Sequence, residues 1–121
     1  MKIHRSHTGK QSEEPEHRLF EAIATIKTVE EARKFFHDLC TPMELQAMAD
    51  RWRVVDLIKV GKPYRKIYEE TGVSVTTVGR VARFMMLGEG GYNVIYERLE
   101  KKSHEGSTKV KNRNTKERAS K

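Results

Sequence analysis

The 121-residue chain has a single cysteine, Cys40, so no disulfide can form within it. Aromatic residues make up only 7% of the sequence and hydrophobic residues 36%, which is little for a chain that must close a core alone. No hydrophobic run approaches the ~18 residues of a membrane-spanning helix, and the N-terminus lacks a signal-peptide pattern. We therefore expect a soluble, cytoplasmic protein with a buried Cys40 thiol, no membrane partner, and a thin core completed by oligomerisation.

The patterns of enzymes and metal proteins are also missing. The five histidines, at positions 4, 7, 17, 37 and 104, lack cysteine or carboxylate partners at the spacing of catalytic or zinc sites. The segment "GEGG" at residues 88–91 has neither the preceding strand nor the following lysine of a phosphate-binding loop. We predict no enzymatic activity, no metal and no cofactor.

Positive charge is in excess, and most of the excess lies at the C-terminal end. The net charge is +7, and residues 101–121 hold eight Lys/Arg and two Glu, whereas residues 1–100 hold 16 basic and 15 acidic residues. The last residues also lack an apolar face. We predict a disordered basic tail over residues 103–121 and a mobile arm over residues 1–12. Such a tail favours polyanions but specifies no particular one.

Between these ends, residues 13–102 carry six helical patterns. Pro15 lies near the start of the first, and the capping boxes Thr28…Glu31 and Thr41…Glu44 open the second and third. The apolar faces expected for these three are Leu19, Phe20, Ile23 and Ile26; Val29, Ala32, Phe35, Phe36 and Leu39; and Leu45, Met48, Ala49, Trp52, Val55 and Ile58. The third pattern is the longest and ends near Gly61.

The last three patterns are shorter and cover residues 63–71, 74–87 and 92 to about 102. Gly72 separates the first two. The inward residues expected are Ile67; Val75, Val78, Val81, Ala82 and Met85; and Val94, Ile95 and Leu99. The β-branched run "VSVTTV" is also compatible with a strand. We favour a helix because the strand would stand alone in an all-α chain.

Residues 63–87 have the form of a helix-turn-helix, which needs a short helix, a tight turn and a second helix that fits the major groove. Gly72 permits the positive φ of a sharp turn. Residues 51–87 hold eight Lys/Arg and three Asp/Glu. The side chains expected to face DNA are Lys62, Arg65 and Lys66 before the turn, Ser74 at the start of the second helix, and Thr76, Thr77, Gly79, Arg80 and Arg83 on its outer face.

The segments "CTPMELQAMADRWRVV" and "LIKVGKPYRKIYEETGVSVTTVGRVARFMMLGEGGYNVIYERL" resemble the trp repressor superfamily, and look closest to its trp-repressor-related members. The resemblance covers about half of the chain. It implies an all-α, six-helix fold, an intertwined homodimer, and a hairpin that reads DNA. The DNA-contacting positions of the family fall on Tyr64, Arg65, Tyr68, Val75, Thr76, Thr77, Gly79 and Arg80.

The same resemblance implies that the tryptophan pocket of the repressor is vestigial here. Thr41, Arg51 and Arg80 match residues of that pocket, but bulky Val81 and Phe84 replace two small residues. A leucine of the partner chain becomes Asp38. We predict that L-tryptophan does not bind in the manner of the repressor, which leaves any small effector unidentified.

The leading hypothesis is a homodimeric, sequence-specific, DNA-binding transcriptional regulator. One alternative is a general nucleic-acid or RNA-binding module driven by the basic tail. Another is a helical protein-interaction dimer in which the hairpin is only structural.

Overall fold

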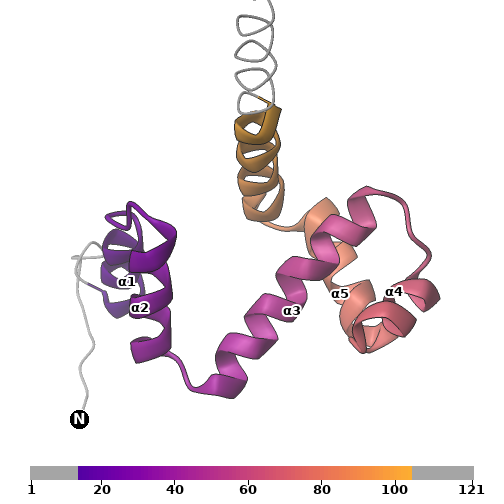
Figure 1. Cartoon of the computed structure of the whole chain (residues 1–121), viewed down its shortest axis with the longest axis horizontal. Coiled ribbons are helices and arrows are strands. Elements are labelled where there is room, and N and C mark those ends of the chain that lie inside the picture. Colours follow the sequence, from indigo (N-terminus) through magenta and orange to yellow (C-terminus); the bar gives the residue numbers. More distant parts are fainter. Residues whose placement is uncertain (1–13, 105–121) are drawn as a thin grey trace, which may run out of the picture. The chain divides into compact units, whose positions relative to one another are not determined.

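The computed structural model describes residues 14–104, and these residues are helical with no strand. The helices are α1 (Pro15–Ile23), α2 (Val29–Leu39), α3 (Pro42–Lys59), α4 (Tyr64–Thr71), α5 (Val75–Leu87) and a sixth over residues 91–104 (Figure 1). The all-α prediction is confirmed, and the "VSVTTV" run forms no strand but enters α5 at Val75. Within residues 14–104, no helix is both long and apolar enough to cross a membrane. The predicted arm and nearly all of the predicted tail lie outside these residues, so the predicted domain limits stay a prediction.

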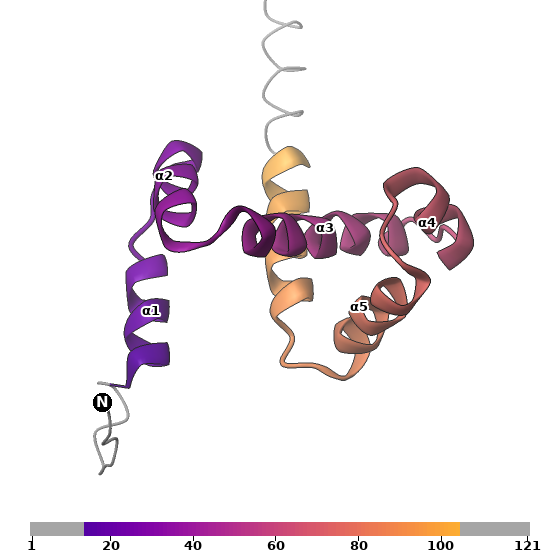
Figure 2. The ribbon, with the colours of Figure 1, turned by 90° about the horizontal axis from the view of Figure 1, so that it is seen from below.

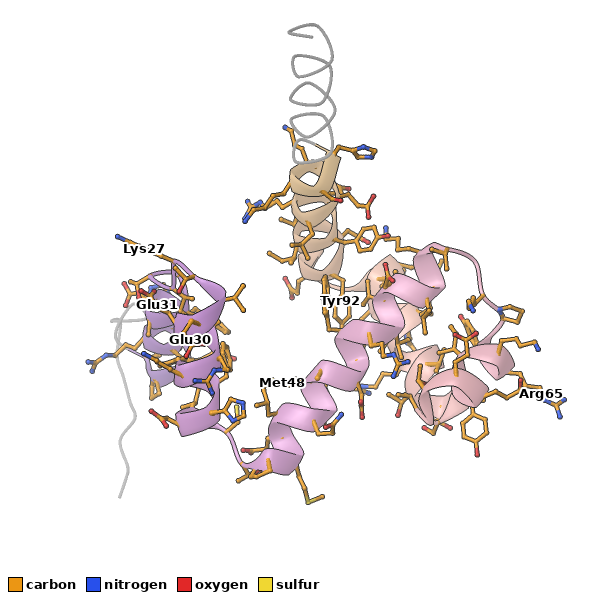
Figure 3. All side chains as sticks on the ribbon, in the orientation of Figure 1. Lys27, Glu30, Glu31, Met48, Arg65 and Tyr92 are labelled. Atoms are coloured by element: carbon orange, nitrogen blue, oxygen red, sulfur yellow. The ribbon has the colours of Figure 1, made fainter. Side chains whose placement is uncertain are left out.

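The chain divides into two compact units, up to Leu45 and from Gln46 onward. In the first unit, the Thr28 hydroxyl caps α2 by accepting a hydrogen bond from the Glu31 amide at 3.0 Å. The Glu31 carboxylate accepts from the amide of Lys27 at 2.9 Å, one residue before the position that a capping box predicts (Figure 3). The capping box of α3 is complete, because Thr41 and Glu44 each accept from the amide of the other.

Over residues 14–45, the first unit has no closed core of its own. No residue of α1 or α2 is buried. Val29 is 87% exposed, and Cys40, expected to be buried, is partly exposed at the end of α2. These apolar side chains lie along helical faces and are in contact with water in the single chain.

The core of the second unit lies where α3, α4 and α5 meet. It contains Val54 and Val55 of α3, Ile67 of α4, Val73 of the turn, and Val78 and Val81 of α5. Val54 was not expected inward, whereas Ala49, which was, is exposed. Two adjacent residues of a helix point about 100° apart. Burial of both Val54 and Val55 therefore means that α3 contacts neighbours across a wide face.

The sixth helix is attached to α3 through aromatic side chains. The rings of Trp52 and Tyr92 stack with centroids 6.3 Å apart. The Tyr96 hydroxyl donates to Asp56 at 3.4 Å, and Lys59 Nζ lies 5.3 Å from the centroid of the Tyr96 ring. Partial burial, together with nearby carboxylates, raises the pKa of Tyr96 above its ordinary value. The phenol therefore keeps its proton, and with it the hydrogen bond to Asp56, to a higher pH than an unperturbed tyrosine would.

Ile67 connects the short helix α4 to this core, which gives a direct test of the packing. We expect Ile67→Ala to lower the free energy of unfolding by about 2–5 kcal/mol, because it leaves a cavity at a fully buried site. Urea denaturation followed by circular dichroism measures this change. The matched control Val60→Ala, at a 63% exposed position, should change stability by less than about 0.5 kcal/mol. Equal effects for the two variants would show that Ile67 does not anchor α4.

Candidate nucleic-acid interface

The turn between α4 and α5 is tight because three consecutive residues form hydrogen bonds that involve its backbone groups. Gly72 has φ +78°, a left-handed conformation, and its amide donates to the Tyr68 carbonyl at 2.8 Å. The Thr71 hydroxyl donates to the Ile67 carbonyl at 2.7 Å and accepts from the Val73 amide at 3.0 Å. Val73 then enters the core at 8% exposure. This sequence of contacts fixes where α5 begins. Figure 2 shows the turn that joins α4 to α5.

Ser74 starts α5 as its N-cap. Its hydroxyl accepts from the Thr77 amide at 3.1 Å and also lies 3.0 Å from the Thr77 hydroxyl, to which it donates. Thr77 is therefore partly buried and engaged in the cap, whereas Thr76 is exposed. Of the two threonines predicted to face DNA, Thr76 is the one whose side chain the structure leaves open.

The two faces of α5 have opposite character. Val78 and Val81 are at most 1% exposed, while Thr76, Arg80 and Arg83 are exposed on the other side. The prediction that Val75 points inward is wrong, since this side chain is 48% exposed. Val73 and Val78 already occupy this end of the core, so the first residue of the helix finds no apolar neighbour to cover it. Its exposure agrees with its place among the expected DNA contacts.

Helix α4 packs against α5 and adds exposed polar and aromatic side chains next to it. Tyr64, Arg65, Lys66 and Tyr68 are all exposed, and Arg65 extends away from the helix (Figure 3). Both cations lie near one carboxylate of their own helix: Arg65 Nε is 3.9 Å and Lys66 Nζ 3.8 Å from Glu69. Exposed pairs of this kind are weak, so a phosphate can replace the carboxylate.

Lys62, the remaining cation before the turn, is differently placed. It forms an ion pair with Glu70 that joins the loop before α4 to the last turn of that helix. Both side chains are 40% exposed. The pair holds Lys62 at the base of α4, so its predicted contact with DNA competes with a contact inside the protein.

Gly79 lies in the middle of α5, yet no packing within residues 14–104 requires it. A Cβ atom there would have the Tyr64 ring as its nearest neighbour, with Cε2 at 4.0 Å, which is an ordinary contact. A glycine inside a helix costs about 1 kcal/mol relative to alanine. Close approach of another helix or of DNA would explain a glycine at this position. Close approach of another helix finds no support within residues 14–104.

The residues of the predicted vestigial pocket belong to both units and differ in burial. Thr41 belongs to the first unit and the other four to the second. Val81 lies in the core, and Phe84 is 45% exposed with its ring 5.1 Å from the Arg80 guanidinium. Phe84 also lines an open depression of about 510 Å³ together with Trp52, Gly88, Glu89, Gly91, Tyr92 and Ile95. The pocket as a whole stays a prediction.

The pairing of Arg80 with Phe84 is not among the predictions from the sequence. Its signal was a cation and an aromatic residue four positions apart, which places them on the same side of a helix. The stack of Trp52 on Tyr92 was missed too, and no local spacing could have revealed it because 40 residues separate the two rings.

A short helix, a glycine turn and a second helix with a buried apolar face and an exposed polar face define a helix-turn-helix protein. Sequence comparison extends this assignment from the hairpin to the chain. The model of the family described as "Trp repressor protein" matches residues 15–100, and the chain belongs to this family.

Comparisons with individual proteins agree with this family assignment. YerC of Bacillus subtilis (strain 168), described as an uncharacterized protein, is 38% identical over 91 residues, which are 75% of this chain and 88% of YerC. The crystal structure of a TrpR-like protein from Eubacterium eligens ATCC 27750 superposes with a TM-score of 0.67 at 34% identity, covering 74% of this chain and 93% of that one. A putative Trp repressor from Staphylococcus aureus gives a TM-score of 0.65 at 40% identity, over 69% and 83% of the two chains.

The two glycines of the hairpin are expected to respond oppositely to the same substitution. Gly72→Ala should lower the free energy of unfolding by about 1–2 kcal/mol, because an L-residue is strained at this positive φ. Gly79→Ala should raise it by about 1 kcal/mol, since the helix gains propensity without a clash. Urea denaturation of both variants measures the difference. A destabilised Gly79→Ala protein would contradict the packing described around this residue.

Proposed function

We propose that this protein is a sequence-specific DNA-binding regulator of transcription that acts as a homodimer and does not use tryptophan as a corepressor. The observation that carries the proposal is the division of α5 into a buried valine face and an exposed face with Thr76, Arg80 and Arg83. Membership of the Trp repressor family supports it.

The exposed face has the chemistry of a major-groove reader. Thr76 is short enough to reach base edges and carries a methyl group that can contact thymine, while an arginine can donate two hydrogen bonds to guanine. Gly79 has no side chain, so the helix backbone between Thr76 and Arg80 can approach the bases closely. Of the other predicted contacts, Val75 and Arg83 are exposed on α5, Ser74 caps it, and Thr77 is partly buried in the cap.

The side chains of α4 suit the phosphates at the edge of the groove. In a helix-turn-helix the first helix crosses the DNA backbone. Arg65 and Lys66 have exposed cationic ends there, Tyr64 and Tyr68 can donate through their hydroxyls, and Lys62 lies at the base of the helix. Such contacts position the protein without reading sequence.

The homodimer is supported by apolar side chains that the single chain leaves uncovered. In the first unit Phe20, Val29, Leu39 and Met43 are 50–87% exposed, and in the second Leu87, Ile95 and Leu99 are 46–73% exposed. A small chain with so few buried residues gains stability by association. A second copy would give the regulator two reading helices, and a twofold axis would place its half-sites about one helical turn, ~34 Å, apart.

The reading role of α5 can be tested with a duplex selected from a random pool. We expect Arg80→Ala and Thr76→Ala each to weaken specific binding by about 1–3 kcal/mol, the value of a base contact. The matched control for loss of one positive charge is Arg98→Ala, an exposed residue of the sixth helix, which should leave specificity unchanged. Fluorescence anisotropy at fixed salt provides the affinities.

Three other outcomes would contradict the proposal. If Arg98→Ala weakens binding as much as Arg80→Ala, the assigned reading face is wrong. Preference for structured RNA over the selected duplex would favour the alternative of an RNA-binding module. Absence of duplex binding even at low salt would leave a protein-interaction dimer.

Independence from tryptophan is tested by isothermal titration calorimetry. We expect no binding of L-tryptophan at micromolar concentrations, because by the resemblance Val81 and Phe84 are bulky where the pocket of the repressor has small residues. The experiment uses the full-length protein, with and without the selected duplex. Micromolar binding in either state would overturn this part of the proposal.

A further inference from the structure

Arg80 differs from the other cations of the hairpin in what it touches. Its guanidinium carbon lies 5.1 Å from the centroid of the Phe84 ring, one helical turn further along α5. At this distance a cation is attracted to the face of an aromatic ring. Phe84 is 45% exposed, so its ring is not held in place for the sake of the core.

This contact leaves the N–H groups of Arg80 without a carboxylate partner within residues 14–104, unlike the cations before the turn. Lys62 is paired with Glu70, and Arg65 and Lys66 lie 3.9 and 3.8 Å from Glu69. The Lys62–Glu70 pair must be exchanged before Lys62 binds a phosphate, whereas the exposed contacts with Glu69 are weak. The face of an aromatic ring attracts the guanidinium but does not occupy its N–H groups as a carboxylate does. The N–H groups of Arg80 therefore stay available. Within residues 14–104, Arg80 has no ion pair with a carboxylate.

We propose that Phe84 is a positioning residue that holds the Arg80 guanidinium in the orientation it uses on DNA. The inference rests on the proposed DNA-binding function and adds to it a residue that orders one of the DNA-contacting side chains. Ordering a long side chain on binding costs free energy, and a side chain already held against a ring avoids part of that cost. The chain itself supplies the element that orders Arg80.

A double-mutant cycle tests the proposal on the full-length protein with the selected duplex. Phe84→Leu keeps an apolar side chain but removes the ring, and should weaken specific binding roughly two- to fivefold. In an Arg80→Ala background the same change should have no further effect, because the side chain that the ring orders is gone. In an Arg83→Ala background, the matched control, it should again weaken binding two- to fivefold.

Two further measurements separate positioning from packing. Phe84→Trp keeps an aromatic face and should restore the wild-type affinity that Phe84→Leu loses. In the free protein, ¹⁵N relaxation of the arginine Nε–H groups should show greater mobility for Arg80, but not for Arg83, in Phe84→Leu. Sedimentation of each variant should show the same assembly as the wild type.

The outcomes distinguish this inference from the function on which it depends. If the wild type binds the duplex and Phe84→Leu weakens binding equally in all three backgrounds, Phe84 acts through packing and the inference is wrong. Unchanged binding by Phe84→Leu would also overturn it, with the DNA-binding function intact. If the wild type binds no duplex, the proposed function fails and the inference falls with it.

Discussion

Val78 and Val81 of α5 meet Ile67 of α4 and the two valines of α3 with almost no surface left to solvent. Full burial of an aliphatic side chain stabilises a fold by about 1.5–3 kcal/mol, so turning α5 to expose this pair would cost several kcal/mol. The rotation of α5 about its own axis is therefore fixed by its buried side. Everything on the opposite side, including Thr76, Arg80 and Arg83, faces outward as a consequence.

Local hydrogen bonds and backbone geometry determine the residue at which α5 begins. The positive φ of Gly72 ends α4, the Thr71 hydroxyl joins the last turn of α4 to Val73, and the Ser74 hydroxyl caps the next helix. These contacts depend on short-range geometry and are independent of the core. Together with the buried valines they define which side chains a DNA duplex would meet.

Much of this arrangement could be predicted from the sequence because it rests on local signals. The caps at Thr28, Thr41 and Ser74, the turn at Gly72 and the inward Val78 and Val81 are all confirmed. Burial of Val54, exposure of Val75 and the Trp52–Tyr92 stack were missed, because each depends on where neighbouring elements lie. The DNA contacts and the homodimer stay proposals, since they involve molecules other than this chain.

Stability and the proposed function make different demands on α5. Gly79 weakens the helix, and Val75 and Phe84 remain nearly half exposed, although each position could hold a residue better suited to a helix in water. The most direct test of whether this face is made for DNA is NMR shift mapping with the selected duplex. The account predicts shifts concentrated at residues 64–68 and 74–83, with the Val78 and Val81 methyl groups still buried. Shifts confined to α1, α2 or the sixth helix would contradict it.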